Sequence, residues 1–205
     1  MFRLISIFLA GTIWFPEIKA DEIRLDFTQK KLGELPEIFS TSLLGKGDPA
    51  NWEIIEKPAP SSVAKANSGN KNLAASRILS QTSSSHLRNG SPICLFKSNE
   101  FGDFTYSVRV RIDSGAFRQI AGIVFRAKDE KNFYALLINS IDKKIMLIKV
   151  VDGKQVPSWS SLGELNLPKN HWHTLSVVCK SDRISCYHNG VMINNGNPFS
   201  DSEQL

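Results

Sequence analysis

Residues 104–112 read FTYSVRVRI, and the alternation in this stretch decides the class of fold. Tyr106, Val108 and Val110 would lie on one face of an extended strand and Arg109 and Arg111 on the other, because successive side chains of a strand point to opposite faces. The stretch predicts a strand with one buried and one solvent-exposed face, which is typical of an antiparallel sheet.

Similar short runs of β-branched and aromatic residues recur along the chain, separated by clusters of Gly, Asn, Asp, Ser and Pro, and helical periodicity is almost absent. Besides 104–112, the sequence predicts strands over residues 22–27, 51–56, 76–81, 92–97, 120–127, 133–139, 144–150, 173–179, 183–188 and 191–194. Many short strands without helices predict an all-β fold, an antiparallel sandwich or jelly roll of two sheets.

Three connections carry residues that close turns. AKDEKN (127–132) and NSIDKK (139–144) contain Asp and Asn, whose side chains hydrogen bond to the backbone that follows them. HNG (188–190) contains the Asn-Gly pair that favours a type I′ hairpin.

The order of several motifs resembles a known superfamily. They are LDF (25–27), WEII (52–55), FGDFTYSVRV (101–110), AGIVFRAKDEKNFYA (121–135), NHWHTLSV (170–177) and CYHNG (186–190). Over residues 23–195 the chain resembles the concanavalin A-like lectin/glucanase sandwiches, and more closely the bacterial exported domains called family-16-glycoside-hydrolase-like or 3-keto-disaccharide-hydrolase-like. The resemblance implies an antiparallel concanavalin A-like jelly-roll sandwich of two sheets.

The resemblance also implies closing strands after the Asn-Gly hairpin. The sequence up to Leu205 does not contain them, so we expect a chain that is truncated or has lost these strands. The first strand would then keep an unpaired edge, which favours pairing with another chain.

The first twenty residues, MFRLISIFLAGTIWFPEIKA, are typical of a signal peptide. Arg3 gives the positive start, an apolar run follows, and Ala20 is a small residue for cleavage. An uncleaved anchor is the alternative, although the apolar run is shorter than a membrane-spanning helix requires. We therefore predict a signal peptide over 1–20, one sandwich domain over 21–205, and a periplasmic or extracellular location without a membrane span after cleavage.

The charge of the chain does not indicate a nucleic-acid partner. The formal net charge is +5, and the Lys and Arg residues are scattered rather than gathered into a basic stripe. The sequence predicts no nucleic-acid binding and no cofactor.

The stretch HWHTLSVVCKSDRISCYHNG (171–190) holds most of the reactive side chains. If Asp182 and Arg183 form the centre of its turn, Cys179 lies opposite Cys186 and a disulfide is conceivable; if the turn lies one residue earlier, the two miss each other. Two buried, inert thiols are the alternative.

The histidines of this stretch are weak candidates for a metal site. His171 and His173 share a face of the predicted strand and would form half of a site, but only His188 lies near enough to add a ligand. The resemblance implies that the neighbouring Trp-His pair belongs to the framework. We therefore predict no metal.

The predicted binding residues lie earlier in the chain. Arg126, Asn132 and Tyr134 supply planar donors and a ring that suit a sugar, and the resemblance implies that this region faces the concave sheet. An Arg126–Asp129 pair that braces the hairpin is the alternative. Trp159, predicted to lie in a loop, would either stack on a sugar or cap the sandwich.

No paired-carboxylate motif of a retaining glucanase is present in the sequence. We therefore expect an exported carbohydrate-binding module whose partner is a carbohydrate or polysaccharide. Two alternatives stay open. The resemblance implies a glycoside hydrolase or lyase acting on a disaccharide or a 3-keto sugar, with His173, Asp129 and Arg126 as the first residues to substitute. An envelope protein–protein interaction module is the other alternative, suggested by the expected unpaired edge.

Overall fold

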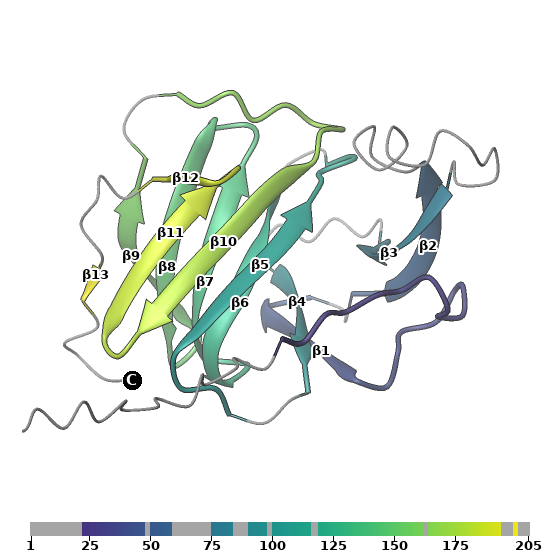
Figure 1. The fold of residues 1–205 in the computed structure, drawn as a ribbon, viewed down its shortest axis with the longest axis horizontal. Helices are drawn as coiled ribbons and strands as arrows, with labels where there is room; N and C mark the ends of the chain where they lie inside the picture. Colours follow the sequence, from purple (N-terminus) through teal and green to yellow (C-terminus); the bar gives the residue numbers. More distant parts are fainter. Residues whose placement is uncertain are drawn as a thin grey trace, which may run out of the picture.

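The computed structural model describes residues 22–47, 50–58, 75–83, 90–97, 100–115, 119–161, 164–193 and 199–200. All secondary-structure elements assigned within these ranges are β-strands (Figure 1), which confirms the predicted all-β class. The predicted signal peptide lies outside the described residues, and none of them forms a helix long and apolar enough to cross a membrane.

Four consecutive strands form one of the two main sheets, which we call the meander sheet. They are β6 (Ile120–Asp129), β7 (Asn132–Asn139), β8 (Lys144–Val151) and β9 (Lys154–Ser160), paired in that order. All three pairings are antiparallel, as short connections between neighbouring strands require.

The second main sheet lies in front of the meander sheet in Figure 1 and is called the front sheet. Its strands are β5 (Phe104–Val110), β10 (His173–Lys180), β11 (Arg183–His188) and β12 (Val191–Met192), with β13 (Phe199–Ser200) also paired to β11. Val108 and Val110 pack against the core between the sheets, whereas Arg109 is exposed, as the alternation predicts.

The main core lies between these two sheets. Leu136 and Ile138 of β7 are fully buried there against Leu175 and Val177 of β10. Two sheets that pack face to face over such a core form a β-sandwich, so the predicted sandwich is confirmed.

The meander sheet is also covered on its other face. β1 (Phe39–Gly45) pairs with β4 (Gly90–Phe96), and Leu44 and Ile93 from this two-stranded sheet pack against Phe133 and Val150 of the meander sheet. β7 consequently buries residues on both of its faces, which explains its nearly continuous apolar sequence.

A separate two-stranded sheet, β2 (Trp52–Pro58) with β3 (Ala75–Gln81), lies to one side of the sandwich (Figure 1). The N-terminal segment runs along it, because the amide of Gly33 donates to the carbonyl of Ile54 at 2.9 Å and the amide of Ile54 donates to the carbonyl of Glu34 at 3.0 Å.

The predicted turn chemistry is confirmed at all three connections. Asp129 Oδ1 accepts from the amide of Lys131 at 2.7 Å, and Asn139 Oδ1 accepts from the amide of Ile141 at 3.0 Å. Asn189 and Gly190 have φ values of 49° and 82°, and positive φ at both central residues is the mark of a type I′ turn.

One predicted strand was wrong. Residues 22–27 form no strand, and no described strand pairs with them. The strands β1, β9 and β13 were not predicted. Proline is largely confined to edge strands and bulges, and β9 satisfies both conditions: it is an edge strand whose pairing with β8 shifts register beside Pro157.

Candidate functional site

The meander sheet ends in a β-bulge at Arg126, one of the residues predicted to bind a sugar. The register of β6 against β7 shifts between Phe125 and Asp129, and Arg126 has a φ of 48°, in the left-handed region. Its guanidinium Nη2 donates to the carbonyl of Ser181 in the β10–β11 turn, so Arg126 joins the two sheets. We call this part of the molecule the bulge end.

Asn132 braces the same end of the meander sheet. Its Nδ2 donates to both carboxylate oxygens of Asp129 at 3.0 Å, and its Oδ1 accepts from the amide of Asp152 at 3.0 Å. Two hydrogen bonds lower the pKa of Asp129: the larger effect comes from the side chain of Asn132 and the smaller from the amide of Lys131. Arg126 and Asn132 are thus hydrogen bonded within the protein, and their binding of a sugar stays a prediction.

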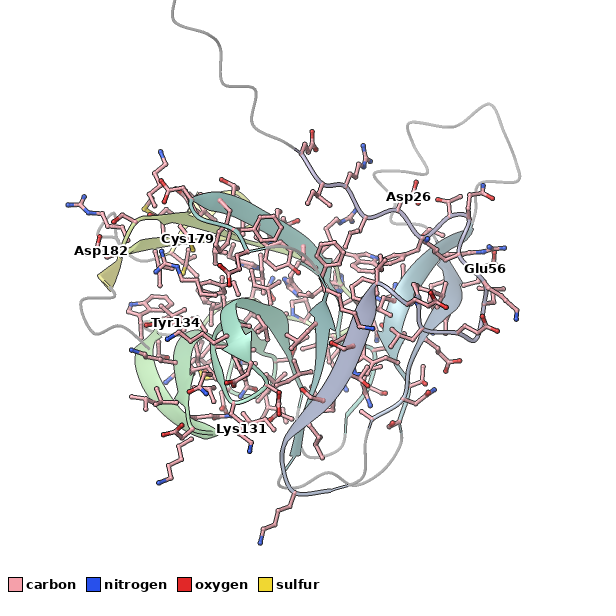
Figure 2. All side chains as sticks on the ribbon, turned by 90° about the horizontal axis from the view of Figure 1, so that it is seen from below. Asp26, Glu56, Lys131, Tyr134, Cys179 and Asp182 are labelled. Carbon is pink, nitrogen blue, oxygen red and sulfur yellow. The ribbon has the colours of Figure 1, made fainter. Side chains whose placement is uncertain are left out.

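Tyr134 does not offer its ring to a ligand. It is only 4% exposed, and its ring stacks on Phe125 with centroids 5.8 Å apart, while Lys149 Nζ lies 5.7 Å from the ring centroid. In the view of Figure 2 it lies on the same side of the molecule as Cys179 and Asp182, opposite Asp26 and Glu56. The prediction of an exposed stacking surface at Tyr134 was wrong, because β7 is buried on both faces.

The predicted loop position of Trp159 was also wrong. Trp159 belongs to β9, where it pairs with Leu147, and it packs partly buried against the main core. This placement matches the alternative prediction, in which the indole caps the sandwich.

Of the two alternatives for Cys179 and Cys186, the register contradicts the possible disulfide and agrees with two buried thiols. Cys179 lies opposite Ile184 and Cys186 opposite Val177, because the turn is centred on Ser181 and Asp182, one residue earlier than a disulfide needs. Both cysteines are free and buried. Burial raises the pKa of Cys179 to about 11 and that of Cys186 to about 12, so the thiols are unreactive at neutral pH.

The opposite end of the front sheet, which we call the histidine end, holds two facing imidazoles. His173 Nδ1 lies 3.1 Å from His188 Nε2, and His173 Nε2 lies 3.3 Å from the carbonyl of Pro168. His173 is 5% exposed, and His188 is half-buried. Burial, and then the neighbouring His173, lower the pKa of His188, so His188 favours its neutral form.

An aromatic residue on the outward side of the front sheet lies beside two arginines. The guanidinium carbons of Arg109 and Arg111 lie 5.4 Å and 5.0 Å from the ring centroid of Trp172. Asp113 accepts from Arg111 through both oxygens, at 2.6 Å and 3.1 Å, and Lys57 Nζ lies 3.5 Å from the same carboxylate. We call these five residues the Trp172 cluster.

Hydroxyl groups extend the outward face beside this cluster. Ser107 Oγ and Ser176 Oγ are hydrogen bonded at 2.8 Å, and Thr174 pairs directly with Arg109. Tyr187 lies next to Ser176 on β11. The alternation of β5 predicts Arg109 and Arg111 on this face, but the arrival of Trp172 beside them depends on long-range pairing that no local pattern reveals.

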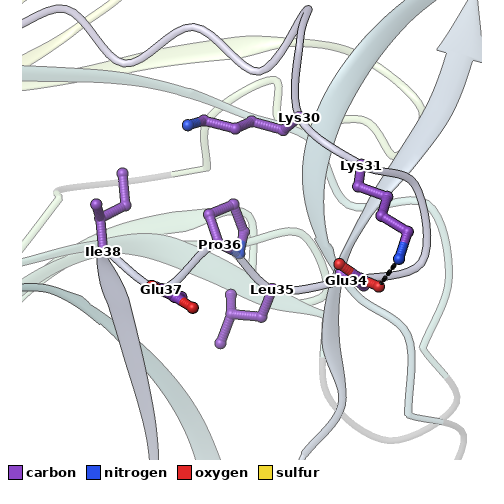
Figure 3. A pocket seen from close by; sticks show the side chains of 7 residues that line it. All are labelled: Lys30, Lys31, Glu34, Leu35, Pro36, Glu37 and Ile38. Carbon is purple, nitrogen blue, oxygen red and sulfur yellow. Dashed lines mark hydrogen bonds and ion pairs between the residues drawn. The ribbon is translucent and has the colours of Figure 1, made fainter.

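A further groove of about 350 Å³ lies along the N-terminal segment (Figure 3). Its lining residues are Lys30, Lys31, Glu34, Leu35, Pro36, Glu37 and Ile38, and Lys31 forms an ion pair with Glu34 across its edge. None of the residues predicted from the sequence to bind or catalyse lines this groove.

The structure does not bring His173, Asp129 and Arg126 together. Arg126 contacts Ser181 at the end of β10 that is remote from His173. Eight residues of strand separate these two ends, and a rise of about 3.3 Å per residue places them roughly 25 Å apart. These three residues therefore do not form one catalytic site. Among the described residues, no group of three or more His, Cys, Asp or Glu side chains is placed to hold a metal ion.

Comparisons with known proteins give a family match and a partial structural similarity. The family model described as 3-keto-alpha-glucoside-1,2-lyase-like domain matches residues 40–204. A solved structure described as carbohydrate binding module CBM66 from Bacillus subtilis is similar at 22% identity and a TM-score of 0.42. The match covers 45% of this chain and 57% of that one. No curated protein matches the chain.

Proposed function

The chain belongs to the family of 3-keto-alpha-glucoside-1,2-lyase-like domains, and from this premise we propose that it is a carbohydrate-binding β-sandwich module. The single observation that supports the proposal is the Trp172 cluster on the outward face of the front sheet. Trp172 is half-buried, and the two guanidinium groups beside it offer several donors in one plane to the hydroxyls of a sugar.

Arg109 is the residue of this cluster best placed to contact a ligand. It is exposed, and it pairs across the sheet with Thr174, next to the hydrogen-bonded Ser107 and Ser176. A guanidinium and neighbouring hydroxyls on one face offer hydrogen-bond donors and acceptors to the hydroxyls of a saccharide. Arg111, held by Asp113, keeps the indole of Trp172 in position.

The test is a glycan array followed by calorimetry on the full chain and on two arginine variants. Arg109→Ala is expected to weaken binding roughly tenfold or more, as loss of a central arginine does at interfaces. Arg183→Ala is the matched control, because Arg183 is exposed at the other end of the front sheet, where it pairs with Lys180. Absence of binding to every glycan, or an equal loss in both variants, would reject the proposal.

The family membership also favours a second candidate function, the cleavage of a 3-keto-α-glucoside by elimination. A base would remove the proton at C2, which the neighbouring C3 ketone makes acidic, the C1–O bond would break, and the leaving oxygen would take up a proton. Release of sugar from 3-keto disaccharides, but not from ordinary ones, would support this function. His173, Asp129 and Arg126 are the first positions to substitute, each separately; if none of the three variants changes the rate, the reaction centre lies elsewhere.

We also propose that the module acts after export, because residues 1–20 have the charge and apolar pattern of a signal peptide. Expression of the full chain in a bacterium and mass analysis of the product would test this. Cleavage after Ala20 is expected, and a full-length cytoplasmic product would contradict it.

A further inference from the structure

We propose that His173 and His188 form a binding site for one borderline transition-metal ion, such as Zn²⁺ or Cu²⁺. The site is separate from the Trp172 cluster, and the proposal does not depend on carbohydrate binding. It rests on the distance between the two rings, on the hydrogen bond that orients one of them, and on the rigid hairpin that carries the other.

The facing nitrogen atoms have a separation that suits a shared metal ion. His173 Nδ1 and His188 Nε2 are 3.1 Å apart, with ring centroids at 5.3 Å and ring planes inclined by 30°. Two imidazole nitrogens bound to one tetrahedral zinc ion at about 2.0–2.1 Å lie roughly 3.3 Å apart. The ion would lie beside the line that joins the two nitrogens, so binding requires a widening of a few tenths of an ångström and a tilt of both rings that turns their lone pairs towards the ion.

The contact of His173 with Pro168 places the lone pair where the ion needs it. His173 Nε2 lies 3.3 Å from the carbonyl oxygen of Pro168, and an imidazole next to a carbonyl carries its proton on that nitrogen. His173 Nδ1 then presents its lone pair towards His188. Metal-binding histidines commonly donate their other ring N–H to a backbone carbonyl in this way.

Metal binding changes the tautomer of His188 but not the charge of the protein side chains. In the metal-free pair, the Nε2–H of His188 donates a hydrogen bond to His173 Nδ1. When the ion binds, that proton moves to His188 Nδ1 and Nε2 becomes a ligand, so two neutral imidazoles bind the ion.

The hairpin after His188 holds the site rigid. Asn189 Oδ1 accepts from the amide of Thr174 at 2.9 Å, and the amide of Asn189 donates to the carbonyl of Thr174 at 2.8 Å. These bonds fix His188 relative to β10, which carries His173. His188 is only half-buried, which leaves a path from solvent.

The ligand set determines which ions bind. Imidazole nitrogen suits Zn²⁺, Cu²⁺ and Ni²⁺, whereas Mg²⁺ and Ca²⁺ require oxygen ligands. No third His, Cys, Asp or Glu side chain joins the pair among the described residues. Water completes the coordination, and we expect an affinity on the order of micromolar, far below that of four-ligand structural zinc sites.

The experiment is calorimetric titration of the full, chelator-treated chain with Zn²⁺, repeated with Mg²⁺. One Zn²⁺ per chain and no Mg²⁺ are expected. His188→Gln removes one ligand and is expected to weaken Zn²⁺ binding at least about tenfold. His171→Ala is the matched control, because His171 is exposed and contacts only the carbonyl of Lys169, at 3.0 Å, among the hydrogen bonds of the described residues.

A second readout separates the proposed site from a change in folding. Electron paramagnetic resonance of the Cu²⁺-loaded chain is expected to show two imidazole nitrogens in the wild type and one or none in His188→Gln, with thermal unfolding confirming that the variant is folded. Failure of Zn²⁺ to bind would overturn the proposal. So would unchanged binding by folded His188→Gln, or loss of binding in His171→Ala.

Discussion

At the bulge end Arg126 crosses from the meander sheet to the carbonyl of Ser181, and at the histidine end His173 faces His188 within the front sheet. The sequence pattern favours function at the bulge end, which is rich in planar polar groups. In the structure, that end is occupied with holding the two sheets together. The histidine end keeps two facing nitrogens, one on the buried His173 and one on the half-buried His188. Residue types alone thus indicate polarity, whereas the available partners decide whether a polar group braces the fold or serves a ligand.

Tyr134 gives the strongest test of this comparison, because truncation of a core ring destabilises the fold, whereas truncation of a ligand-binding ring on the surface does not. Tyr134→Ala is expected to lower the free energy of unfolding by about 3–5 kcal/mol, as for other buried aromatic residues, and Tyr134→Phe by much less. Urea unfolding followed by circular dichroism measures both. An unchanged unfolding midpoint for Tyr134→Ala would mean that the ring is not part of the core.

The two buried thiols provide a second test, through the pH dependence of the free energy of unfolding. The pKa values of Cys179 and Cys186 are raised by burial, from an ordinary 9.0 to about 11 and about 12. The contribution of the protonated thiols to the free energy of unfolding is therefore complete below pH 9. It declines as the pH rises towards their pKa values in the folded protein, because the unfolded chain loses these protons first. Between pH 9 and 10 each thiol is expected to reduce the free energy of unfolding by about 1 kcal/mol.

The double variant Cys179→Ala, Cys186→Ala is the control for this effect, since its stability should fall less steeply over the same pH range. Thiol titration provides an independent check. All three cysteines should react after denaturation, and a count of one would establish the disulfide that the register contradicts. A disulfide would shift the β10–β11 turn by one residue and break the contact between Arg126 and Ser181.

Arg126 gives the sharpest distinction between bracing and strain. Arg126→Ala removes a charge-assisted hydrogen bond at a half-buried position and is expected to cost about 1–2 kcal/mol. Arg126→Gly removes the same bond, but glycine adopts the φ of 48° without strain and should recover up to about 1 kcal/mol. Equal stabilities of the two variants in thermal unfolding would show that the left-handed conformation stores no strain.

Alternation and turn chemistry predict most of the fold because both act over a few residues. The strand at 104–112 and the Asn189–Gly190 hairpin follow from local patterns of this kind. The strand predicted at 22–27 failed for the opposite reason. Its alternation is genuine, but Ile23 and Leu25 are 55% and 40% exposed, and a strand also requires a partner, which local sequence does not provide.

The candidate sites were harder to predict, because they depend on long-range pairing and on single-residue registers. Trp172 meets Arg109 and Arg111 only after β10 pairs with β5, although the four strands of the meander sheet lie between them in the sequence. The fate of Cys179 and Cys186 depended on a turn placed one residue earlier or later, since such a shift changes every cross-strand partner. Tyr134 was misplaced because the pairing of β1 with β4, which was not predicted, covers the second face of its sheet.

The pairing of β1 with β4 over the meander sheet has a consequence for the order of folding. The meander sheet closes only short loops between consecutive strands, whereas β1 must find β4 over a long separation, with Phe39 paired to Phe96. Distant contacts form late, because loop closure must precede them. We therefore expect a folding intermediate in which Phe133 and Val150 still face water, and this uncovered surface is where newly synthesised chains would associate if β1–β4 docking were slowed.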